Sequence, residues 1–175
     1  MSLLAAGCAS AVRNEVDEVR LDVHKGHFEE AVRQAASLRE QHPNEAAYEE
    51  LHKQASVAWL LEQGRRATFQ DHDLEALTTF LRAQEIDPDS PETSSWVHKT
   101  LRKLSRTWLE RGLELHASGK LAEAVEAYGK ALEYAPGDPS ALNGLGEAII
   151  QINYREGLGK KYFEDGIRAL SSYWL

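Results

Sequence analysis

The chain has 175 residues, and its 28 acidic against 20 basic side chains give a formal net charge of −8. A hydrophobic content of 42% and a charged content of 27% are ordinary for a globular protein and exclude a disordered acidic tail. The acidic balance argues against a nucleic-acid-binding protein, because a phosphate backbone needs a clustered basic face. A single cysteine excludes a disulfide framework and a cysteine-based zinc site. With only 5 Pro and 12 Gly among many good helix formers, the composition predicts an all-α protein.

The first segment, residues 1–11, contains a short apolar run followed by small residues and Cys8. This pattern resembles the end of a bacterial lipoprotein signal, in which cleavage precedes a cysteine that is then acylated. The resemblance implies a lipid on Cys8 as the sole membrane attachment, and a place in the bacterial cell envelope as a periplasmic outer-membrane lipoprotein. A basic region is missing, and the apolar run is shorter than the ~7–15 residues of a signal core. The alternative is therefore a plain tail on a cytoplasmic protein.

The middle of the chain repeats itself at a fixed offset. Residues 43–88 align with residues 91–136, so that Gly64 falls on Gly112 and Phe80 on Tyr128. The segment from Gly26 to Pro43 repeats the second half of the pattern. A fixed period of this kind is typical of solenoid proteins.

These residues resemble the tetratricopeptide repeat, a helix–turn–helix unit of about 34 residues. The best copy covers residues 105–138 and has Trp108, Gly112, Ala124 and Tyr128 at the family positions. The resemblance implies an all-α fold, a right-handed α-solenoid of about four helix pairs over residues 12–175. The units are expected at about 12–45, 44–90, 92–138 and 139–175.

The first helices of the second and third units are expected to be elongated. The stretches from Pro43 to Gly64 and from Pro88 to Gly112 are each more than twice as long as the stretch from Pro136 to Gly146. Both extra segments have an apolar stripe, with Tyr48, Leu51 and Ala55 in one and Trp96, Val97, Leu101 and Leu104 in the other. We expect these extensions to pack on each other. The alternative is that the Trp96 region forms a docking or homodimer surface.

Few side chains are arranged for catalysis or metal binding. His24 and His27 flank Gly26 at a helix–turn junction, so they do not share one helix face. Residues 157–161 are rich in glycine and lysine but lack the spacing of a phosphate-binding loop, and are expected to be a flexible joint. No nucleophile with a histidine and an acid in catalytic order is visible. We therefore expect no enzyme activity, no metal and no cofactor.

The resemblance also implies a concave groove lined by the first helix of each unit. Its expected lining residues are Arg13, Val16, Arg20, Val23, Ala58, Leu61, Arg65, Thr68, Arg106, Leu109, Leu113, His116, Ser140, Asn143, Glu147 and Ile150. The four arginines in this set predict a protein or peptide partner that carries carboxylates, because the guanidinium fork binds them well. The alternative is that these arginines pair with glutamates of the chain itself.

The C-terminal segment, residues 160–175, is unusually apolar. Its large apolar side chains are Tyr162, Phe163, Ile167, Leu170, Tyr173, Trp174 and Leu175. Solenoids commonly end in a capping helix with a polar outer face. Three interpretations are open: the segment packs back onto the fourth unit, the chain belongs to a longer protein, or the segment docks a partner or a second copy.

The sequence thus predicts a non-enzymatic protein–protein adaptor. With the lipoprotein-like segment it resembles lipid-anchored repeat proteins that help to assemble machines of the bacterial envelope. The competing hypothesis is a structural solenoid segment of a larger envelope or secretion protein, without a ligand in its groove.

Overall fold

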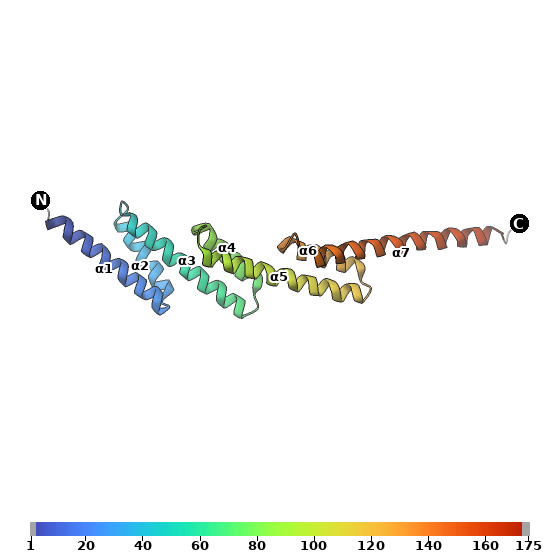
Figure 1. Ribbon diagram of the computed structural model, residues 1–175, viewed down its shortest axis with the longest axis horizontal. Helices are drawn as coiled ribbons and strands as arrows, with labels where there is room; N and C mark the ends of the chain where they lie inside the picture. The colour runs from blue at the N-terminus through green and yellow to red at the C-terminus, as the bar shows by residue number, and fades with distance from the viewer. Residues whose placement is uncertain (1–2, 173–175) are drawn as a thin grey trace. The chain divides into compact units, whose positions relative to one another are not determined.

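The computed structural model describes the backbone of residues 3–172, and the side chains of residues 12–162 and of Glu164. The described backbone forms seven α-helices (Figure 1). They are α1 (Leu3–Lys25), α2 (Phe28–Gln41), α3 (Ala46–Phe69), α4 (Asp73–Ile86), α5 (Pro91–Ala117), α6 (Leu121–Tyr134) and α7 (Pro139–Ser172). The chain divides into two compact units, residues 1–100 and 101–175, and the boundary falls within α5.

The helices follow one another as pairs of a long first helix and a short second helix. The second helices α2, α4 and α6 have 14 residues each, whereas α3 has 24 and α5 has 27. The predicted all-α fold of helix pairs, with elongated first helices in the second and third units, is thus confirmed. Helix α1, with 23 residues, is equally long and begins at Leu3, inside the segment expected to be a tail. The right-handed stacking of the units stays a prediction.

Tight turns join the two helices of each pair. One residue of each turn has a positive φ, and these residues are Gly26 (82°), Asp71 (57°) and Gly119 (78°). Glycine adopts this left-handed conformation without strain, and Asp is among the few other residues that tolerate it. Two polar residues then begin the next first helices: Ser90 Oγ accepts the Thr93 amide at 3.3 Å, and Asp138 Oδ1 accepts the Ala141 amide at 2.9 Å.

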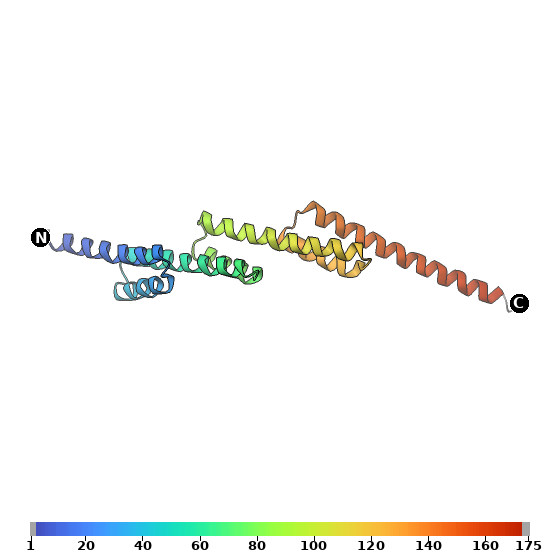
Figure 2. The same cartoon turned by 90° about the horizontal axis from the view of Figure 1, so that it is seen from below.

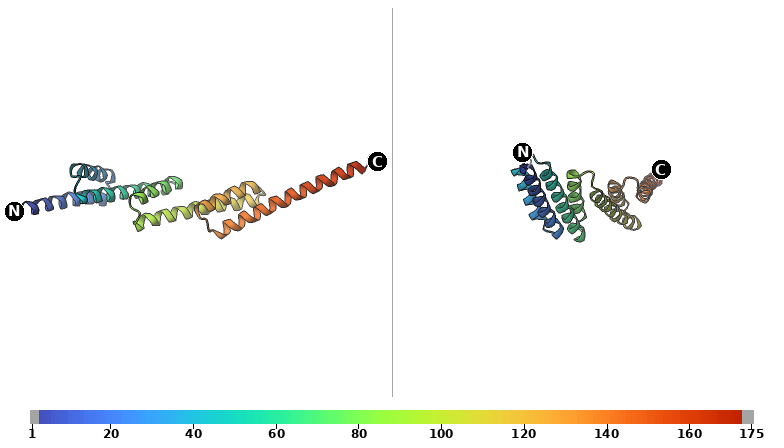
Figure 3. Two further views of the ribbon diagram at one scale, coloured as in Figure 1. Left: turned by 90° about the horizontal axis from the view of Figure 1, so that it is seen from above. Right: turned by 60° about the vertical axis from the view of Figure 1, so that its left-hand side comes forward.

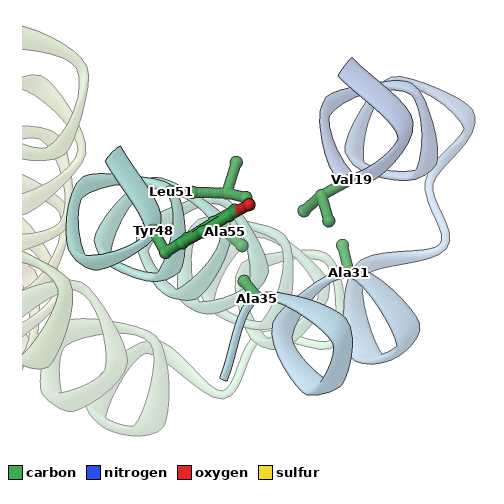
Figure 4. Close-up of a cluster of buried hydrophobic side chains, with 6 residues drawn as sticks. All are labelled: Val19, Ala31, Ala35, Tyr48, Leu51 and Ala55. Carbon is green, nitrogen blue, oxygen red and sulfur yellow. The ribbon is translucent and has the colours of Figure 1, made fainter. Parts of the chain in front are cut away.

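The first core of the N-terminal unit lies between α1, α2 and α3. Figure 4 shows six side chains pointing toward one another: Val19, Ala31, Ala35, Tyr48, Leu51 and Ala55. The apolar stripe of the α3 extension therefore contacts α1 and α2. The Tyr48 hydroxyl donates a hydrogen bond to the carboxylate of Glu15. Burial, followed by this bond to an anion, raises the pKa of Tyr48 to about 12.

The second pair of the same unit is held by a glycine and an aromatic ring. A methyl group at Gly64 of α3 would stand only 2.3 Å from the Phe80 ring of α4, so the two helices approach closely because Gly64 has no side chain. The Phe80 ring also stacks on Trp96, with ring centroids 5.3 Å apart and planes inclined by 18°. Trp96 is half-buried in this contact, and Lys99 Nζ lies 4.6 Å from its ring centroid. These contacts make Trp96 part of the packing of the unit.

The core of the C-terminal unit is built around Tyr128. Its ring lies 2.6 Å from the position of a methyl group at Gly112 of α5, and 2.5 Å from that of one at Gly144 of α7. Leu115, Ala124, Ala127 and Ala148 are buried around it. Tyr128 thus joins three helices because two of them present glycine to its ring.

Helix α7 differs from the expected fourth helix pair. Its 34 residues run without interruption from Pro139 to Ser172, so residues 157–161 are helical and the expectation of a flexible joint is wrong. The backbone of residues 160–172 likewise does not turn back onto the first half of the helix. Figures 2 and 3 show the C-terminal half of α7, in orange-red, with no other helix of its unit beside it. The side chains of Phe163, Ile167 and Leu170, and residues 173–175, lie outside the described part.

Candidate functional site

A hollow of ≈ 330 Å³ lies on the N-terminal unit where α1, α3 and the start of α5 meet. Four of the residues expected to line a groove are brought together there, namely Val23, Ala58, Leu61 and Arg65. The remaining lining residues are Phe28, Gln54, Val57, Asp87, Ser90 and Glu92. We call this hollow the α1–α3 hollow.

The floor of the α1–α3 hollow is apolar. Val57 and Leu61 are 8% and 5% exposed, and half-buried Val23 and Ala58 complete the surface. The α3 residues of this set recur every three or four positions on one side of the helix, which is why a single helix supplies most of the floor. Such a floor can take an apolar side chain of a ligand.

The rim of the α1–α3 hollow is charged, and its charges are paired. Arg65 Nη2 lies 3.2 Å from Glu62 Oε2, and Arg65 Nη1 lies 3.3 Å from Glu92 Oε1. Hydrogen bonds donated by Arg66 and Arg65 lower the pKa of Glu62 despite its partial burial. Lys53 Nζ pairs with Asp87 Oδ1 at 3.1 Å. For Arg65, the structure therefore favours the alternative that the groove arginines pair with glutamates of the chain.

The other expected groove residues of this unit do not line the hollow. The Thr68 hydroxyl donates to the Gly64 carbonyl oxygen at 2.9 Å, a contact within α3 itself. Arg13 and Arg20 are exposed on α1. Their side chains form no ion pair with any residue whose side chain is described.

In the C-terminal unit the expected residues have different roles. Arg106 is exposed and its Nε lies 2.9 Å from Glu110 Oε1, one turn along α5. Leu109 packs against the core, whereas Leu113 is 52% exposed. Asn143 and Glu147 are exposed on α7.

His116 connects the three helices of this unit. Its Nδ1 lies 3.3 Å from Tyr128 Oη, and its Nε2 lies 3.0 Å from Gln151 Nε2. Burial, and then the charge of Glu147, raise the pKa of Tyr128. His116 therefore makes polar contacts that link α5 to α6 and α7. Its position in the repeat instead predicts a residue that lines the groove.

A second hollow, of ≈ 550 Å³, was not expected from the sequence. It lies on the α2 side of α3, and its lining includes His27, Arg33, Trp59 and Arg66. Ion pairs within the chain, Arg33 with Glu30 and Arg66 with Glu62, occupy most of its charged groups. The α1–α3 hollow is the smaller of the two, but its apolar floor makes it the better candidate for binding.

The sequence missed Phe28, Val57 and Glu92 as residues of the α1–α3 hollow. Phe28 begins α2 and Glu92 stands in the first turn of α5, so neither falls at a groove position of a first helix. No pattern within one repeat could have predicted Phe28 and Glu92, because they reach the hollow through the packing of neighbouring pairs. Val57 lies on α3 one turn before Leu61, so helical periodicity could have found it.

Among the described residues, no group of three or more His, Cys, Asp or Glu side chains is placed to hold a metal ion. His27 Nδ1 instead lies 3.4 Å from Asp22 Oδ1. No described helix combines the length and the apolar character needed to cross a bilayer. The side chain of Cys8 lies outside the described part.

The helix pairs, the glycine–aromatic contacts and the tight turns define a helical-repeat protein of the α-solenoid class. Residues 112–152, from the middle of α5 to the middle of α7, match the family model described as TPR repeat. This segment contains Tyr128 and both of the glycines that its ring contacts. TPR repeats generally mediate protein–protein interaction and are typically non-enzymatic. A comparison of the chain with curated proteins gives no match.

Proposed function

We propose that this protein is a non-enzymatic adaptor that binds a segment of a partner protein in the α1–α3 hollow. The observation that carries the proposal is the convergence of Val23, Ala58 and Leu61 into one apolar floor beside Arg65. Small, mostly apolar concavities with a few polar groups at the rim are the usual binding sites of proteins. An apolar side chain of the partner enters the floor, and its polar backbone contacts the rim.

Arg65 gives the site its preference for a carboxylate. The guanidinium presents a planar fork that binds carboxylates in two-point contacts. Glu92, its partner from α5, has a side chain that is 59% exposed, and exposed ion pairs contribute little to stability. A carboxylate of the partner can therefore replace Glu92 at Arg65 at small cost. The proposed ligand is a peptide that has an apolar residue near an acidic residue or a free C-terminus.

Selection from a random peptide library tests this function. Peptides that bind the wild-type protein should lose binding by at least about tenfold in Ala58→Arg, because the new side chain fills the floor. The matched control is Ala122→Arg, which places the same side chain at an exposed position of α6. Arg65→Gln should reduce the binding of acidic peptides more than that of their amide analogues.

The competing hypothesis, a structural segment without a groove ligand, predicts a different outcome. It is favoured by the pairing of Arg65 and Arg106 with glutamates of the chain. Under this hypothesis the selection yields no peptide whose binding depends on Ala58 or Arg65. Equal binding to wild type and Ala58→Arg would therefore reject the α1–α3 hollow as the site.

We further propose that Cys8 carries a lipid and that the adaptor works in the bacterial envelope. The proposal is supported by the small and apolar residues before Cys8 in the sequence. Detergent phase partitioning of the protein expressed in a bacterium tests it, with Cys8→Ala as the comparison. Wild type in the detergent phase and Cys8→Ala in the aqueous phase is the expected result, and both proteins in the aqueous phase would contradict it.

A further inference from the structure

Both complete glycine–aromatic pairs have the same spacing along the chain. Phe80 stands as far after Gly64 as Tyr128 stands after Gly112. In each pair the aromatic ring of the second helix lies close to the place that a methyl group on the glycine would occupy. The nearest ring atom is 2.3 Å from that place at Gly64 and 2.6 Å from it at Gly112. We call the glycine of such a pair the notch.

Helix α7 contains a notch that is open. Gly146 follows Gly112 at the length of one repeat, about 34 residues. A methyl group at Gly146 would have no atom within 4 Å. Leu142 and Ile149 lie one turn to either side of it and are 49% and 42% exposed. Within the described residues, no second helix covers this face.

The residue that would fill this notch is present further along α7. Tyr162 follows Gly146 at the same spacing that separates the glycine and the ring in both complete pairs, and it is 71% exposed. In the continuous helix the two residues are about 24 Å apart along the axis, so Tyr162 does not reach Gly146. Tyr162 and Gly146 therefore have the sequence spacing of a complete glycine–aromatic pair, although the ring is exposed and the notch is open in the continuous helix.

Helix α7 also has a residue suited to a turn at the position where the complete pairs have theirs. The residue with a positive φ follows the notch at one constant spacing in both complete pairs, at Asp71 and at Gly119. The corresponding residue of α7 is Asn153. Asn is one of the few residues besides Gly that adopts the left-handed conformation readily. A break of α7 at Asn153 would thus need no strained residue.

We propose that α7 has a second, closed conformation, in which it turns at Asn153 and residues 154–164 dock on Gly146 with Tyr162 in the notch. The occupant of this exposed apolar face is thereby a segment of the same chain. The closed form buries Tyr162, Leu142 and Ile149, which are exposed in the open helix. It also completes a fourth helix pair like the first three.

Side-chain size and charge oppose the closed form. Leu158 stands where the complete pairs have the buried alanines Ala76 and Ala124, so overpacking weakens the closed form. Lys161 stands where they have Thr79 and Ala127, which are also buried, and a charge is costly to bury. Gly157 and Gly159 lie within a helix in both forms, so their low helix propensity favours neither. The burial of Tyr162, Leu142 and Ile149 is what stabilises the closed form against these costs.

The geometry of the helix argues against a second copy as the occupant. Successive residues of an α-helix are turned by about 100°, so Gly146 and Tyr162 lie about 160° apart around a continuous α7. A second α7 lying alongside cannot cover both residues from one side. Within one chain, only a break in the helix brings Tyr162 round to a notch with the geometry of the complete pairs.

Distance measurement between spin labels at Ser140→Cys and Glu164→Cys, in a Cys8→Ser chain, tests the proposal. The continuous helix places these positions about 36 Å apart. The closed form brings them to within about 20 Å, because packed helix axes are about 8–10 Å apart and the labels add length. A short-distance population is expected in the labelled chain without further substitution. It is also expected in Tyr162→Phe, because a phenylalanine, Phe80, fills the notch at Gly64. The population should fall at least fivefold in Tyr162→Ala.

Gly146→Ala is the second test, with Gly159→Ala as its matched control. Both changes raise helix propensity equally, and neither new methyl group meets an atom within 4 Å in the open helix. Only Gly146→Ala fills the notch, so it should reduce the short-distance population more than Gly159→Ala does. A single distance near the value of the continuous helix in every variant overturns the proposal. A short distance that appears on mixing two singly labelled chains would assign the notch to a second copy and overturn it as well.

Discussion

The ring of Phe80 lies directly against the backbone of Gly64, with its Cε1 atom 2.3 Å from the place a methyl group would occupy. Phe80 is fully buried and its ring stacks on Trp96. The ring therefore cannot move aside to accommodate a larger residue at position 64. The close approach of α3 and α4 depends on this one absent side chain.

Gly64→Ala should accordingly lower the free energy of unfolding by about 1–3 kcal/mol, the usual cost of overpacking a core. Chemical denaturation followed by far-UV circular dichroism measures it. Gly129→Ala is the control, because a methyl group there meets nothing within 4 Å and helix propensity alone predicts a gain of up to about 1 kcal/mol. A stabilising Gly64→Ala would show that the two helices are further apart than described.

Gly119→Ala tests the turn between α5 and α6. Gly119 has a φ of 78°, and a methyl group there has free space around it, so any loss arises from backbone strain alone. We expect a destabilisation of about 1–2 kcal/mol. The measurement is again chemical denaturation, and an unchanged midpoint would contradict a left-handed residue at this position.

Trp96→Ala distinguishes a packing residue from a docking residue. Loss of the stacking on Phe80 should lower the free energy of unfolding by about 2 kcal/mol, less than for a fully buried tryptophan. Leu113→Ala, which truncates a side chain that is 52% exposed, should change it by less than about 1 kcal/mol. If thermal melting of Trp96→Ala matches that of wild type, Trp96 contributes nothing to packing. That result would favour the alternative, in which the Trp96 region is a docking or homodimer surface.

Tyr48 predicts an alkaline limit to stability. Its pKa of about 12 in the folded chain lies above the ordinary value of 10.0, so the folded state holds the phenol proton more tightly than the unfolded state does. The resulting stability is fully present below pH 10 and is lost as the pH rises through 12. Tyr48→Phe removes this pH dependence and, at neutral pH, costs about 1.5–3 kcal/mol for the hydrogen bond to the Glu15 carboxylate.

Denaturation of wild type and Tyr48→Phe, at a neutral pH and at a pH between the two pKa values, measures both effects. Wild type should lose more stability than Tyr48→Phe between these conditions. An equal loss in the two proteins would assign the alkaline limit to other groups.

The helix pairs could be predicted because their signals lie within one repeat. Gly64 and Phe80 recur as Gly112 and Tyr128. The first pair shows where this reasoning weakens. At the corresponding positions it has Val19 on α1 and Ala35 on α2, so the large and small residues are exchanged while the core stays filled. A pattern based on residue identity does not recognise such an exchange.

The sequence predicted only part of the candidate site, because some of its contacts join different helix pairs. Ala58, Leu61 and Arg65 share one face of α3, which helical periodicity alone reveals. The pairing of Arg65 with Glu92 joins residues 27 positions apart on different helices, and the link from His116 to Gln151 spans 35. Such contacts depend on how neighbouring pairs pack, which no local pattern specifies.

The sequence by itself determined the helical class, the period of the repeat, the long first helices and the small residues that let helices approach. These properties follow from local propensity, periodicity and side-chain size. Only the tertiary structure decided which arginines have carboxylate partners, which face of Trp96 is covered, and that α7 continues beyond Asn153 as one helix. In α7 the signals for a turn and for a continuous helix compete, and their balance depends on whether packing against Gly146 compensates for breaking the helix.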